Sequence, residues 1–129
     1  MTEQQESRWA VVITALDDMF KVNMDDNADG RDTLTQLQGL VGGLIEAIDL
    51  TDNITMWINE EGLFSNMEVN KTASDLYDKV LQLHLNYNPS IGNIVGDVVF
   101  TGGIDEEGNF TTLQREDELY IEKAWSKYK

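Results

Sequence analysis

The sequence contains no cysteine and only 9 lysine and arginine residues, and both shortages exclude classes of protein. Without cysteine the chain has no disulfide, no thiol nucleophile and no zinc–thiolate site. With so few basic side chains it lacks the clusters that bind the phosphates of nucleic acids or of anionic membrane surfaces. We therefore expect neither nucleic acid nor a membrane to be a direct partner.

Long apolar runs are also missing, since none approaches the ~18 residues of a membrane span. The N-terminal residues 1–7 are polar, have no basic or apolar region of a signal peptide, and are expected to be flexible. Apolar residues make up 41% of the 129 residues, enough for a folded body. The expectation is a single domain over residues 1–129 in the cytoplasm.

Acidic residues are in excess, with 24 against 9 basic ones and a formal net charge of −15. Spread evenly over a surface of about 7,000 Å², they would lie ~17 Å apart, beyond the ~8 Å screening length at physiological salt. Only a clustered part of this charge would attract a partner. The N-terminal half is the candidate, because residues 1–64 hold 13 of the acids and only 3 bases.

The densest acidic stretch is residues 17–32, to which three later acids would add if the fold brings them together. Two interpretations stay open for this set: a solvated surface that keeps the protein dispersed, or a face that binds a basic partner. The residues of the candidate acidic face are Asp17, Asp18, Asp25, Asp26, Asp29, Asp32, Glu46, Asp49 and Asp52.

Hydrophobic periodicity predicts an α+β fold, a small antiparallel or mixed sheet of about four to six strands packed with three helices. Helix spacing and end signals, such as the Gly42-Gly43 pair, predict where the helices stop. Strands are expected at 9–16, 19–24, 44–50 and 54–59 and within 92–101, and helices at 33–41, from 72 or 74 to about 86, and at 115–128.

One segment matches the opening of a calcium loop, D-x-N-x-D-G, at Asp25, Asn27, Asp29 and Gly30. Calcium also needs a bidentate glutamate at the twelfth position, where this chain has Gln36. We interpret the segment as a plain turn and expect no metal and no cofactor.

Catalytic patterns are weak. His84 is the only histidine, and no serine or second histidine stands at a spacing that would make a triad. The acids Asp105, Glu106 and Glu107 precede Gly-Asn, which is the ordinary composition of an exposed turn. The sequence therefore predicts a binding protein and not an enzyme.

Three segments, taken in order, resemble a numbered family of unknown function, family 3846, found in phages, plasmids and conjugative elements. The matching segments are 37–48, 57–63 followed by Asn70 and Ala73, and 94–100 followed by Gly103 and the run 105–108. Together they cover the chain from about residue 34 to its C-terminus. The resemblance implies a mobile-element origin and carries no activity with it.

Three polar residues lie in the segments that resemble this family, and their role has two open interpretations: Asn59, Asn70 and Asp97. Their side chains can fix loops through hydrogen bonds to the backbone, or they can line a small polar pocket.

Two hypotheses about function follow. In the first, a small acidic phage or mobile-element protein binds and inhibits a host protein that has a basic surface, such as a defence or nucleic-acid enzyme. DNA mimicry is the specific form of this hypothesis. In the alternative, a binding module sequesters a small nucleotide-like signal through Asn59, Asn70 and Asp97.

Overall fold

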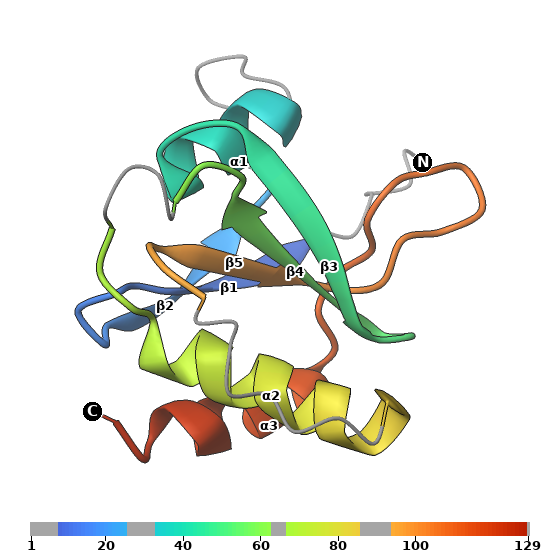
Figure 1. Ribbon diagram of the computed structural model, residues 1–129. Helices are drawn as coiled ribbons and strands as arrows, with labels where there is room; N and C mark the ends of the chain where they lie inside the picture. The colour runs from blue at the N-terminus through green and yellow to red at the C-terminus, as the bar shows by residue number, and fades with distance from the viewer. Residues whose placement is uncertain (1–7, 26–32, 63–66, 86–93, 129) are drawn as a thin grey trace.

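The computed structural model describes residues 8–25, 33–62, 67–85 and 94–128, with the backbone alone for 80–85. Within them, five strands form one sheet in the order β2-β1-β5-β4-β3, and every neighbouring pair is antiparallel. The elements are β1 (Trp9–Ile13), β2 (Met19–Asn23), α1 (Thr33–Val41), β3 (Ile45–Thr51), β4 (Ile54–Asn59), α2 (Lys71–Leu85), β5 (Val98–Thr101) and α3 (Arg115–Trp125). The α+β class expected from the sequence is confirmed (Figure 1).

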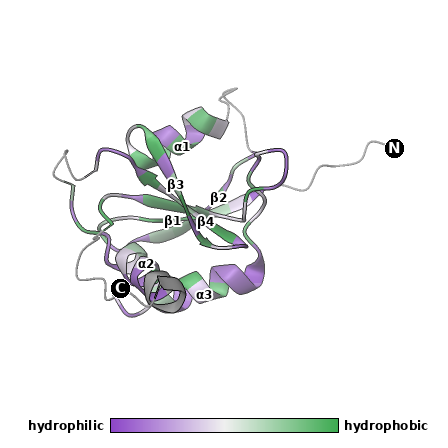
Figure 2. Cartoon of the chain, turned by 45° about the vertical axis from the view of Figure 1, so that its right-hand side comes forward, coloured by the Kyte–Doolittle hydropathy of each residue, from purple (hydrophilic) through white to green (hydrophobic). Residues whose placement is uncertain are grey.

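Helices cover both faces of the sheet, α1 on one side and α2 with α3 on the other (Figure 1). Figure 2 shows the hydrophobic residues gathered along the strands between these layers. On the α2 and α3 side the largest fully buried side chains are Phe100, Ile13, Leu50 and Ile54. On the α1 side a smaller cluster joins Leu37 and Val41 to Val12, Val99 and Phe110.

The central strands are mostly apolar and largely buried because both of their faces are covered. In β5 every residue from Val98 to Thr101 is fully buried, and in β1 only Trp9 reaches solvent. β2 and β3, at the two edges of the sheet, instead carry mostly exposed and half-buried residues, although Leu50 of β3 is buried.

β1 and α3 are shorter than the sequence predicted, and turns cause both differences. β1 ends at Ile13 because the chain turns toward β2 at Asp17, whose φ of 68° lies in the left-handed region. β5 lies within the expected segment 92–101 and begins at Val98, just after Gly96, whose φ of 81° turns the chain. α3 ends at Trp125, three residues before the expected end, since the hydrogen bonds of the next residues form a final tight turn.

Among the residues described, no helix combines the length and the apolar character needed to cross a membrane.

Candidate functional site

The predicted acidic residues lie at opposite edges of the sheet. Asp17 and Asp18 lie in the turn between β1 and β2, and Asp25 follows β2. Glu46 and Asp49 lie on β3, which is four interstrand steps, or about 19 Å, from β2. The described members of the set therefore do not form the single face expected from the sequence. The others, Asp26, Asp29 and Asp32, lie outside the described residues.

Asp25, at the β2 edge, is held by Arg8. The Arg8 Nη2 lies 2.7 Å from Asp25 Oδ1, and the Arg8 backbone N–H donates to Oδ2 at 2.7 Å. The hydrogen bond from the guanidinium group is the main reason why the pKa of Asp25 lies below its usual value. This carboxylate fixes the start of β1 to the end of β2 and is not free for a partner.

Asp17 also has internal contacts. Its carbonyl oxygen accepts a hydrogen bond from the indole N–H of Trp125 at 2.6 Å, and its Oδ2 lies 4.0 Å from the Lys71 ammonium group. The turn between β1 and β2 is thereby attached to α3 and to the start of α2. Of the described acids at this end, Asp18 and Asp25 are exposed and Asp17 is half-buried.

The acids at the β3 edge have a different environment. Glu46, Asp49 and Asp52 are exposed, and the sequence has no lysine or arginine from 33 to 62 or from 94 to 114. Asp49 accepts a 3.4 Å hydrogen bond from the Thr55 hydroxyl group. Within the described part of the chain, no lysine or arginine lies within ion-pair distance of these three carboxylates.

The turn between β3 and β4 lies against the loop that follows β5. Asp52 and Asp105 line the same hollow of about 260 Å³, and a Cβ added at Gly103 would overlap the Asp52 carbonyl oxygen. The exposed acids of the two segments therefore lie along one side of the sheet, here called the acidic edge, with Glu46 and Asp49 on opposite faces of β3 because side chains alternate along a strand. Its members are Glu46, Asp49, Asp52, Asp105, Glu106 and Glu107.

Among the described residues, β3 is also an edge strand, and no described strand pairs with the backbone groups along its outer side. The Glu60 N–H donates to the Leu44 carbonyl oxygen at 2.8 Å, which sets the alternation of the antiparallel ladder. By that alternation, Ile45, Ala47 and Asp49 direct their N–H and C=O groups away from β4. The acidic edge thus combines carboxylates with free backbone donors and acceptors.

The amide of Asn59 fixes a loop. Its Nδ2 donates to the Val41 carbonyl oxygen at 3.1 Å, and its Oδ1 accepts from the Glu61 N–H at 2.8 Å. The end of α1 is thereby joined to the turn after β4.

Asn70 has a similar role and is fully buried. Its Nδ2 donates to the carbonyl oxygens of Ile13 and Gly96, while its Oδ1 accepts from the Ala73 N–H and caps α2. Both hydrogens of this amide are in use, so Asn70 presents no donor to a ligand. Of the three predicted pocket residues, Asn59, Asn70 and Asp97, it is Asp97 that lines a pocket formed by the described residues.

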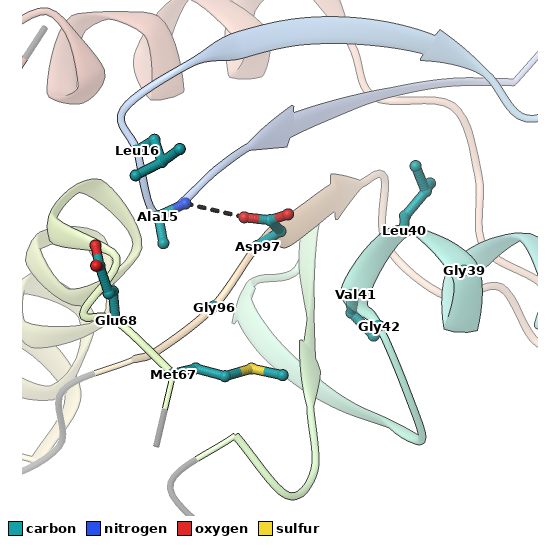
Figure 3. A pocket seen from close by; sticks show the side chains of 10 residues that line it. All are labelled: Ala15, Leu16, Gly39, Leu40, Val41, Gly42, Met67, Glu68, Gly96 and Asp97. Carbon is teal, nitrogen blue, oxygen red and sulfur yellow. Dashed lines mark hydrogen bonds between the residues drawn. The ribbon is translucent and has the colours of Figure 1, made fainter. Parts of the chain in front are cut away.

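That pocket has a volume of about 410 Å³ and lies between the β1–β2 turn, the end of α1 and the segment before β5 (Figure 3). The Asp97 Oδ1 accepts a hydrogen bond from the Ala15 N–H at 3.0 Å. The residues that line the pocket are Ala15, Leu16, Gly39, Leu40, Val41, Gly42, Met67, Glu68, Gly96 and Asp97.

Sequence reasoning singled out Gly96 and Asp97 but missed Leu16 and Met67. The sequence marked Leu16 only as the last residue of the strand expected at 9–16, whereas the structure places it in the turn after β1, where it is 74% exposed. Met67 contributes through its long side chain, and its Sδ would lie 2.8 Å from a Cβ at Gly96. Patterns within a short stretch of sequence do not show that the segments around Leu16 and Met67 meet at one pocket.

The described residues define an α+β domain built on one antiparallel sheet, with an acidic edge and a separate pocket. The model of DUF3846, a domain of unknown function, matches residues 11–126, and the chain belongs to that family. The resemblance found in the sequence is confirmed. No curated protein and no solved structure matches the chain.

Proposed function

We propose that this protein binds a partner protein through the acidic edge and blocks a basic surface of that partner. The observation that carries the proposal is the position of Glu46, Asp49 and Asp52 on an exposed edge strand and its turn, in a stretch of sequence without lysine or arginine. Attraction between such a surface and a basic partner speeds association and selects against acidic partners.

The geometry favours an extended basic segment as the bound element. Such a segment can add to β3 as a further strand, hydrogen-bonded to the outward backbone groups of Ile45, Ala47 and Asp49. Lysine or arginine side chains of the segment would then reach Glu46 and Asp49. Each such exposed pair contributes only about 0.2–1 kcal/mol, so the backbone ladder supplies part of the affinity.

We do not extend the proposal to DNA mimicry. Glu46 and Asp49 are three residues apart, or about 10 Å along a strand. Phosphates of one DNA strand recur about every 3.4 Å of helix axis, so the acidic edge carries far fewer charges than a duplex.

The proposed partner rests on the resemblance seen in the sequence. Because the family resemblance points to phages, plasmids and conjugative elements, we propose a host protein as the partner, bound in the cytoplasm of the cell. The role proposed is inhibition by occupancy, in which the partner's basic surface is covered and no bond is made or broken.

Sequestration of a nucleotide-like signal is not favoured by the pocket. Asp97 and Glu68 line it, and none of its described lining residues is a lysine or arginine. A phosphate group entering it would meet negative charge and no basic partner.

The test compares two variants of equal net charge. The triple variant Glu46→Gln/Asp49→Asn/Asp52→Asn removes three charges from the acidic edge. The control Glu116→Gln/Asp117→Asn/Glu122→Gln removes three charges from α3. Each protein is immobilised and exposed to host lysate at about 0.05 M and about 0.5 M salt, which shortens the screening length severalfold.

We expect a host protein that the wild type and the α3 control retain at low salt, and that the acidic-edge variant does not retain. Its binding should weaken at high salt. Retention of the same proteins by all three forms, or retention that salt does not change, would contradict the proposal. Thermal unfolding of both variants checks that each is folded.

A further inference from the structure

We propose that the 410 Å³ pocket binds a small organic cation, an ammonium or guanidinium group carried on an apolar body. This inference is independent of the acidic edge, because neither Asp97 nor Glu68 belongs to that surface. It rests on the shape of the pocket, on the chemistry of its lining and on the position of one carboxylate.

The lining is mainly apolar, as is usual for small-molecule sites. Ala15, Leu16, Leu40, Val41 and Met67 supply side-chain carbon and sulfur, and Figure 3 shows that they come from three separate segments. A volume of 410 Å³ falls in the range of about 300–1,000 Å³ that holds small ligands. An apolar ligand body would therefore gain by leaving water here.

Asp97 supplies the polar group. One of its carboxylate oxygens accepts from the Ala15 N–H at 3.0 Å, which fixes the orientation of the side chain. Among the described residues, no hydrogen bond or ion pair is made by the other oxygen, so it is available as an acceptor. In Figure 3 the carboxylate lies between Ala15 and Leu40, at the wall of the pocket.

The charged residues of the lining determine that the pocket attracts a positively charged ligand. Glu68 is a second, exposed carboxylate, and the described lining includes no basic side chain. The nearest base in sequence, Lys71, has its ammonium group 4.0 Å from Asp17 and is not part of the lining. A cation would gain two attractive charges, whereas an anion would be repelled.

The wall that carries Asp97 is held in place before any ligand binds. The Gly96 N–H donates to the Glu68 carbonyl oxygen at 2.8 Å, and the Gly96 carbonyl oxygen accepts from Asn70 at 2.9 Å. Gly96 has a φ of 81° and a Met67 side chain packed where a Cβ would stand. A pre-arranged wall reduces the entropy that binding would otherwise cost.

The experiment uses 2-phenylethylammonium as the probe and 3-phenylpropionate as its counterpart, in which a carboxylate replaces the charged amine. Titrations are followed by amide chemical shifts in two-dimensional NMR spectra of the whole chain. We expect 2-phenylethylammonium to shift the signals of Ala15, Gly42, Gly96 and Asp97, and 3-phenylpropionate to leave them in place.

The variant Asp97→Asn tests the carboxylate, because an asparagine oxygen can still accept from the Ala15 N–H. We expect its affinity for the cation to fall about three- to fivefold, as for one partly exposed ion pair. Glu106→Gln, which removes the same charge from the loop after β5, should leave the affinity unchanged.

Three results would overturn the proposal: no shift at the pocket signals, equal binding of the carboxylate probe, or unchanged affinity in Asp97→Asn. If that variant fails to fold, Glu68→Gln takes its place, since Glu68 is exposed and its side chain is not part of the core. Weaker cation binding in Glu68→Gln is then the expected result, and unchanged binding would refute the proposed charge selection.

Discussion

The side-chain amide of Asn70 donates to the carbonyl oxygen of Ile13 at 2.8 Å and so joins the N-terminus of α2 to the last residue of β1, 57 positions earlier. The same nitrogen donates to Gly96, and the amide oxygen caps α2 at Ala73. One fully buried side chain therefore holds three segments of the chain together, including the segment that carries Asp97.

The first prediction concerns this amide. Asn70→Ala should lower the free energy of unfolding by about 2–4 kcal/mol, because it removes a helix cap and leaves two buried carbonyl oxygens without their donor. Urea denaturation measures the loss. Asn53→Ala, in the exposed β3–β4 turn, is the matched control and should change stability by no more than about 0.5 kcal/mol. A loss below about 1 kcal/mol for Asn70→Ala would contradict the role given to the amide.

A second prediction compares two glycines of the loop after β5. An alanine Cβ at Gly103 would overlap the Asp52 carbonyl oxygen, whereas at Gly108 it would meet nothing and only the φ of 85° is unfavourable. Gly103→Ala should therefore move the loop and shift the amide NMR signals of Asp52 and Asn53. Gly108→Ala should cost about 1–2 kcal/mol and leave those two signals in place. Equal spectra for the two variants would mean that the loop does not pack on the β3–β4 turn.

Much of the secondary structure could be predicted from the sequence because its signals are local. The helix expected at 33–41 is observed with those bounds, since apolar spacing marks its length and Gly42, with a φ of 82°, marks its end. The strands at 54–59 and 19–24 were also found to within one residue. β-branched runs between turn residues are local patterns of the same kind.

The candidate site could not be predicted because it depends on strand order. β5, from the C-terminal half, lies between β1 and β4, and this places Asp17 and Glu46 at opposite edges. Nothing in either segment indicates such long-range pairing. Similarly, the sequence suggested Asn70 as a loop-fixing residue, but its partners Ile13 and Gly96 lie 57 and 26 positions away.

A third prediction concerns acid. Hydrogen bonds from Arg8 lower the pKa of Asp25 in the folded protein, so the pair stabilises the fold above the unfolded pKa of about 3.9. This contribution is lost as the pH falls through the lower, folded pKa. Asp25→Asn should therefore cost about 1 kcal/mol near pH 7, a value reduced by the partial exposure of the pair, and close to nothing near pH 2.

Urea denaturation of the wild type and of Asp25→Asn at both pH values measures this difference. Glu106→Gln, in an exposed turn, removes the same charge and should alter stability little at either pH. A loss of equal size at both pH values would show that Asp25 acts through packing and not through its charge.

The last prediction is a stabilising change in α2. Burial, and then the carboxylate of Asp75 one turn earlier, raise the pKa of Asp78 in the folded protein. The folded state therefore binds the proton of the Asp78 carboxyl group more tightly than the unfolded state does. Stability falls as the pH rises from the unfolded pKa of about 3.9 through the raised pKa of the folded state. Asp78→Asn should increase the free energy of unfolding by about 0.2–0.5 kcal/mol near pH 7, as for removal of one like-charge pair, and not near pH 2.

Asp75→Asn is the matched variant and should have the opposite effect near neutral pH. Its carboxylate lies 3.3 Å from the Lys79 ammonium group and 3.6 Å from that of Lys127, so its removal breaks two ion pairs. Repeated thermal and urea unfolding of both variants, each against the wild type, resolves differences of this size. If both substitutions stabilise the protein, total negative charge and not local geometry governs the stability of α2, because both variants lose one acid.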